Sequence, residues 1–198
     1  MLNFNDGTLH VEKARVLMGG WGLLILLAAI VNQFFDLPNP NYVLLLWTGV
    51  TVLGILAHIT SLIHGLGQNF VAWVVVIVIG WAFTFYVVKF DNGAHIDLYG
   101  DLAGVWLILL GIGYIPTAYH VERHFLIFAA LHIVAGVLLE LSARGVMRIS
   151  FLDTYSTLIF GLVAGLPLLV AALPQWYRAE APQPSPAVAE SSIQQPGA

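Results

Sequence analysis

The segment FVAWVVVIVIGWAFTFYVV, residues 70–88, decides the fold, because it contains no acidic or basic side chain. A helix needs about 20 apolar residues to cross the hydrocarbon core of a bilayer. In lipid the backbone must satisfy its own hydrogen bonds, so an uninterrupted run of this length favours a helix over an alternating barrel strand. Of the 198 residues in the chain, 59% are hydrophobic and 9% are charged. Soluble domains carry about 25% charged residues, so lipid is the expected solvent.

Six apolar segments of this kind follow one another along the chain, separated by short connections that contain Pro, Gly, Asn or charged residues. Short connections make successive helices antiparallel neighbours. We therefore predict an all-α, polytopic membrane protein, built as a six-transmembrane-helix antiparallel bundle with short loops. The expected spans are 16–35, 42–64, 70–88, 98–119, 124–143 and 154–176.

The predicted transmembrane domain, 16–177, is flanked by a short polar leader, 1–15, and by a tail, 178–198, that is rich in Pro, Ser and Gln and expected to be disordered. Six spans place both termini on one side of the membrane. Four Lys and Arg residues fall on that side and three on the other, so the positive-inside rule favours a cytoplasmic location for both termini. The four are Lys13, Arg15, Arg123 and Arg178, and the three are Lys89, Arg144 and Arg148.

Composition also excludes several classes of function. The net charge of −4 and the seven Lys and Arg residues provide no basic face for nucleic acid. Cysteine is absent, which excludes disulfides, thiolate metal sites and cysteine nucleophiles. The expected partners are the lipid bilayer and other membrane protein subunits.

Glycines cluster in three of the predicted spans, at spacings that let helices approach closely in lipid. We interpret them as internal packing positions in preference to a dimer interface, because a six-helix bundle has many internal contacts to make. They are Gly19, Gly20 and Gly22, then Gly111 and Gly113, then Gly161 and Gly165.

Histidines supply the candidate chemistry, and three of the seven lie in AYHVERHFLIFAALHIV, residues 118–134. His58 precedes the end of its span at His64 by about 9 Å of helix, and His132 follows the start of its span at His124 by about 12 Å. Two imidazoles at similar depth on two helices match the axial ligation of a b-type haem. We therefore expect His58 and His132 to bind haem b for electron transfer, or each to bind a chlorophyll-type pigment separately.

His120 and His124 form a weaker candidate metal site, since residues four apart share one face of a helix. Glu122 between them would be a general base. However, the chain must turn between two spans at this point, and a broken helix would spoil the geometry.

Other hypotheses stay open beside the haem. A membrane histidine can simply hydrogen bond within or between helices, which suits a non-catalytic structural or assembly subunit of a larger membrane complex. A small-molecule transporter would use helices broken at Pro116 and Pro167. A metal-dependent membrane hydrolase would use the histidines around Glu122. Among the acids, Asp101 is expected to cap a helix, and Glu140 to pair with Arg144 four residues later.

Overall fold

The computed structural model describes residues 5–35, 40–62, 67–90, 98–120 and 123–173. In this part of the chain all regular structure is helical, so the all-α prediction is confirmed. The helices are α1 (Asn5–Phe34), α2 (Pro40–Leu62), α3 (Gly67–Phe90), α4 (Leu98–His120), α5 (Phe125–Ala143), α6 (Ser150–Thr154) and α7 (Ser156–Ala171).

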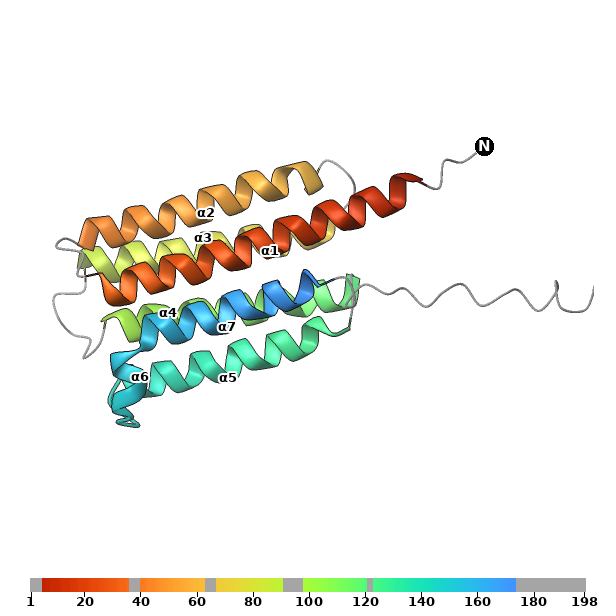
Figure 1. The fold of residues 1–198 in the computed structure, drawn as a ribbon. Helices are drawn as coiled ribbons and strands as arrows, with labels where there is room; N and C mark the ends of the chain where they lie inside the picture. The colour runs from red at the N-terminus through yellow and green to blue at the C-terminus, as the bar shows by residue number, and fades with distance from the viewer. Residues whose placement is uncertain (1–4, 36–39, 63–66, 91–97, 121–122, 174–198) are drawn as a thin grey trace, which may run out of the picture.

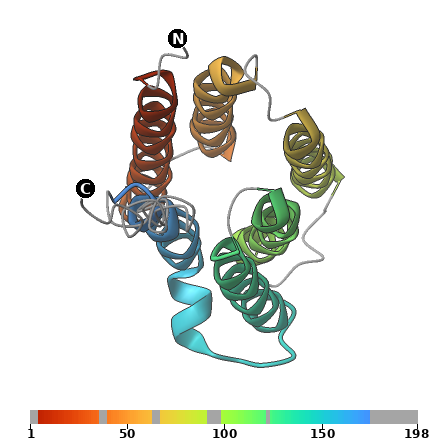
Figure 2. The same ribbon diagram turned by 90° about the vertical axis from the view of Figure 1, so that its right-hand side faces the viewer.

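The long helices lie side by side along one common direction, and successive ones run in opposite directions (Figure 1). Seen along their axes, α1, α2, α3, α4 and α7 form a ring, and α5 lies outside it against α4 (Figure 2). The first turn of α1 and the last turn of α7 lie at the same end of the bundle (Figure 1).

Four helices in the described part of the chain are long and apolar enough to cross a membrane: α1, α3, α4 and α5. The apolar windows in these helices are Val16–Phe34, Val71–Phe90, Tyr99–Tyr119 and Phe125–Ala143. Two further apolar stretches, Asn41–Leu56 in α2 and Ser156–Ala171 in α7, are shorter. Large apolar side chains on the outer faces are exposed, as expected of surfaces that face acyl chains.

Helices α1 and α7 pack closely through glycine. A Cβ atom added to Gly22 would lie 2.7 Å from the carbonyl oxygen of Gly165, and one added to Gly165 would lie 2.7 Å from that of Gly22. At Gly161 an added Cβ would meet the Cβ of Ala29. Small residues allow this close approach of two backbones. The prediction of internal packing is therefore confirmed for Gly22, Gly161 and Gly165, whereas a Cβ added to Gly20 would have nothing within 4 Å.

Helices α4 and α5 form a second closely packed pair. An added Cβ at Gly136 would lie 2.7 Å from the Gly104 carbonyl oxygen, and one at Gly111 would lie 2.9 Å from that of Ala129. The small residues recur seven apart on each helix, which keeps them on one face. Through these contacts α5 buries Phe125, Phe128, His132 and Leu139.

The last predicted span differs from the structure, because the helical region is divided at Tyr155 into the short α6 and the longer α7. Asp153 lies inside α6 and accepts a hydrogen bond from Ser142 at 2.5 Å. The start of α7 is stabilised by Gln33 of α1, whose side chain accepts from the Leu158 N–H at 3.2 Å and donates to the Thr154 carbonyl at 2.9 Å.

At the N-terminus, α1 begins at Asn5, so residues assigned to the predicted polar leader, 1–15, continue the first helix. Helix α5 begins at Phe125, one residue after the predicted start. Pro167 lies within α7, which continues past it to Ala171. The predicted tail, 178–198, falls outside the described residues.

Candidate functional site

An apolar cavity of about 120 Å³ lies among α1, α2, α3, α4 and α7. Four of the six tryptophans in the chain line it, together with aliphatic side chains and Phe160. We refer to it as the tryptophan cavity. Its lining tryptophans are Trp21, Trp47, Trp81 and Trp106.

Two of these tryptophans are held in place by threonines on neighbouring helices. The Trp106 indole N–H donates to the Thr84 hydroxyl at 2.9 Å, and the Trp81 N–H donates to the Thr51 hydroxyl at 3.3 Å. Each threonine in turn donates to a carbonyl one turn earlier in its own helix, Gly80 for Thr84 and Trp47 for Thr51. At Trp81 and Trp106 the cavity wall therefore has satisfied polar groups and fixed aromatic faces.

Glycine makes room for the same aromatic rings. A Cβ atom added to Gly80 would lie 2.6 Å from the Trp106 ring, and one added to Gly54 would lie 2.6 Å from the Trp21 ring. The indoles therefore rest directly against helix backbone. Outside the cavity, Trp73 repeats the arrangement, donating to Thr117 at 3.1 Å while its ring lies over Gly113.

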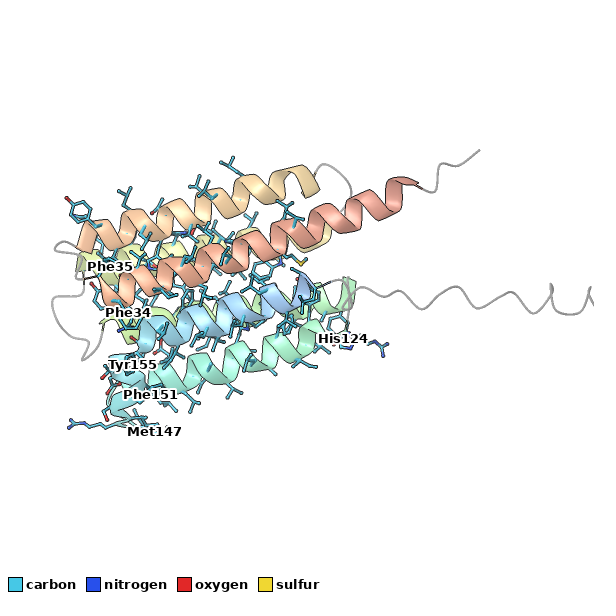
Figure 3. All side chains as sticks on the ribbon, viewed as in Figure 1. Phe34, Phe35, His124, Met147, Phe151 and Tyr155 are labelled. Atoms are coloured by element: carbon cyan, nitrogen blue, oxygen red, sulfur yellow. The ribbon has the colours of Figure 1, made fainter. Side chains whose placement is uncertain are left out.

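A second cavity, of about 320 Å³, adjoins the first at one end of the bundle. Side-chain hydroxyls and amides contribute to its lining, and we refer to it as the polar cavity. Four residues line both cavities, so the two adjoin: Asn32, Val43, Tyr99 and Thr157. Phe34 and Phe35, which also line the polar cavity, mark this end of the bundle, and His124 lies at the opposite end (Figure 3).

The tryptophan cavity extends inward from this end. On α1 its lining runs from Asn32 to Trp21, and on α4 from Tyr99 to Leu110, which is about 16 Å of helix in each case. The site is thus polar at the end of the bundle and apolar farther in. An elongated molecule with one polar end matches this change in lining.

His132 lies elsewhere, in the core between α4 and α5, and is 0% exposed. Its ring meets Tyr114 edge to face at 5.0 Å between centroids. Nδ1 lies 2.7 Å from the Phe128 carbonyl oxygen, and because a carbonyl only accepts, Nδ1 carries the proton. In the neutral ring Nε2 then offers a lone pair, and no group in the described part of the chain donates to it.

The structure does not place α2 beside α5. They lie on opposite sides of the bundle, with α4 and α7 between them (Figure 2). His58 belongs to α2 and His120 to the last turn of α4, but the side chains of both fall outside the described residues. His124 is exposed, just before α5. Among the described residues, no group of three or more His, Asp or Glu side chains is placed to hold a metal ion.

A charged cluster joins α4 to α5 near the end that carries the polar cavity. Arg144 donates to Glu140 at 2.7 Å, which confirms the predicted pair, and also to Asp101 at 3.3 Å. Asp101 lies in the first turn of α4, as predicted, and is 0% exposed. The hydrogen bond to the Glu140 carboxylate raises the pKa of Arg144 above its ordinary value, so the guanidinium remains charged.

The fold and the two cavities define a class: an all-helical protein with helices that can cross a membrane and an internal site lined by tryptophan. Comparison with known proteins adds no narrower identity. No protein-family model, no curated protein and no solved structure matches the chain.

Proposed function

We propose that six helices, α1 to α5 and α7, cross the bilayer, and that both ends of the chain are cytoplasmic. The alternating helix directions support this topology, as does the common end shared by the start of α1 and the last turn of α7. The Lys and Arg distribution supports the orientation.

We further propose that this membrane protein binds an elongated, mainly apolar molecule in the tryptophan cavity. One observation carries the proposal: an internal cavity whose walls are aromatic and aliphatic, with indoles fixed by Thr51 and Thr84. Apolar cavities of about 150 Å³ stay free of water and accept small apolar molecules, and this cavity is of similar size. Ligand sites also occur preferentially between the helices of bundles.

Quenching of tryptophan fluorescence by 1-bromodecane, with the protein in nanodiscs, tests this function. We expect saturable quenching in the wild type, because bromine in the cavity contacts several indoles. Val50→Phe should abolish the saturable part, since Val50 is buried and lines the cavity. Val52→Phe, on the exposed face of α2, is the matched control and should behave like the wild type. Quenching that rises linearly without saturation in all three proteins would count against the proposal.

Binding of haem b or a chlorophyll-type pigment is the second candidate, favoured by the buried lone pair on Nε2 of His132. It is weaker, because α4 and α7 lie between α5, which carries His132, and α2, which carries His58. An absorption spectrum of protein from haem-replete cells tests it. A Soret band that disappears in both His58→Ala and His132→Ala would support the haem, and a colourless protein would remove it.

A further inference from the structure

Resting on the proposed apolar site, we infer that the polar cavity selects the other end of the ligand: an uncharged headgroup with hydroxyl or carbonyl oxygens. The site then takes a neutral amphiphile, with its head at the end of the bundle and its chain in the tryptophan cavity. Neutral glycerolipids and isoprenoid quinones share this chemistry.

The lining of the polar cavity carries the inference on charge. Among its described residues there is no Lys, Arg or His, and the one ionisable acid is Asp153. A phosphate or carboxylate headgroup would enter without a counter-ion and beside a carboxylate, which is unfavourable in a site of reduced dielectric. Uncharged oxygens need only hydrogen-bonding groups.

Two of the polar residues in this lining are already engaged within the protein. Gln33 bonds the start of α7 through both ends of its amide, and Asp153 accepts from Ser142. Both residues have structural roles in shaping the cavity, so other groups in the lining are expected to bind the ligand. The cavity is thus held open by bonds between α1, α5, α6 and α7.

Ser156 is the residue best placed to bind a headgroup. Its side chain is only 4% exposed and lines the polar cavity. No hydrogen bond of its hydroxyl is found within the described part of the chain. The Ser156 hydroxyl is accessible from the cavity, so a ligand oxygen there can form a hydrogen bond with it without breaking one inside the protein.

Thr157 and Asn32 stand next to Ser156 at the junction of the two cavities. The Asn32 amide donates to the Thr157 hydroxyl at a long 3.4 Å, and both residues line both cavities. A headgroup bound to Ser156 would therefore have its first apolar carbons at the opening of the tryptophan cavity. The position of the polar end is consistent with a head near the membrane surface and a chain directed toward the bilayer centre.

The test measures displacement of 1-bromodecane by competitors with ten-carbon chains: decane, monodecanoylglycerol, a decyl-substituted benzoquinone and decyl phosphate. We expect at least one of the two uncharged amphiphiles to bind about tenfold more tightly than decyl phosphate. Comparing monodecanoylglycerol with the decyl-substituted benzoquinone shows whether the site prefers a glycerolipid headgroup or a quinone headgroup.

Ser156→Ala should weaken binding of the preferred probe about fivefold without changing the affinity for decane. Ser150→Ala, at an exposed position on α6, is the matched control and should change neither.

Equal binding of decane, decyl phosphate and the uncharged probes would overturn this inference while leaving the apolar site intact. An unchanged affinity in Ser156→Ala would also overturn it. If decane itself fails to displace 1-bromodecane, the proposed function fails, and the inference fails with it.

Discussion

At the scale of single residues, glycines determine how closely the helices approach. Gly22 and Gly165 expose their backbones to one another across the α1–α7 contact, whereas Gly20, also on α1, has nothing within 4 Å of an added Cβ. Glycine in a helix is unfavourable by about 1 kcal/mol relative to alanine; close packing offsets this cost at Gly22 but not at Gly20. Comparing alanine substitutions at Gly22 and Gly20 therefore separates the effect of packing on stability from the effect of backbone conformational freedom.

Gly22→Ala should destabilise the protein by about 1 to 3 kcal/mol, because the new methyl group would collide with a carbonyl oxygen that cannot rotate away. Gly20→Ala should leave stability unchanged or slightly increased. Thermal unfolding of both variants in one detergent, followed by circular dichroism, measures the difference. A Gly22→Ala protein as stable as Gly20→Ala would contradict the packing of α1 against α7.

The sequence was sufficient to predict some of the contacts between helices but not others. The glycine clusters of α1 and α7 were visible, because several glycines lie close together in the sequence. Gly104 and Gly136 were not singled out, although the seven-residue spacing of Gly104 to Gly111, and of Ala129 to Gly136, would have indicated a common face on each helix. The sequence did not indicate that Asp101 is buried, because its partner, Arg144, lies far away in the sequence, at the end of α5.

At the scale of elements, the helices around the tryptophan cavity are joined by tryptophan–threonine hydrogen bonds. The bond from Trp81 to Thr51 joins α3 to α2, and the bond from Trp106 to Thr84 joins α4 to α3. Neither was predicted, because hydrophobicity marks tryptophan and threonine only as residues compatible with lipid. A small residue or threonine recurring one turn apart, as in Gly80 and Thr84, is the pattern that would have indicated them.

Thr51→Val should destabilise the protein by about 0.6 to 1.7 kcal/mol, the range of hydrogen bonds between membrane helices. The substitution keeps the shape of the side chain and removes the acceptor of the Trp81 N–H. Thr48→Val, at an exposed position one turn earlier on α2, is the control and should change stability little. Denaturation in mixed detergent and SDS compares the two, and equal effects would speak against a structural role for this bond.

At the scale of the whole molecule, composition was enough to predict an all-helical membrane protein, but the neighbours of each helix were not predictable. Loops of similar length permit several arrangements of the same spans. The haem hypothesis depended on α2 and α5 facing each other, and depth along a helix contains no information about its position around the bundle. The tryptophan cavity was missed for the same reason, because its lining comes from five helices.

The six-span topology predicts which positions an impermeant maleimide reaches in intact cells. The chain contains no cysteine, so single cysteines report without background. Phe35→Cys and Arg148→Cys should be labelled, while Arg123→Cys and Leu173→Cys should react only after the membrane is opened. Labelling of Phe35→Cys and Arg123→Cys from the same side would show that α2, α3 and α4 do not all cross. Labelling of Arg148→Cys and Leu173→Cys from the same side would show the same for α7.

The central claim is that the tryptophan cavity holds an apolar molecule in the native membrane. Native mass spectrometry of protein released gently from its own membranes tests this most directly. The account predicts one mass adduct of constant size on the wild type and on Val52→Phe, and its loss in Val50→Phe. An adduct that persists in Val50→Phe, or bare protein in all three preparations, would contradict it.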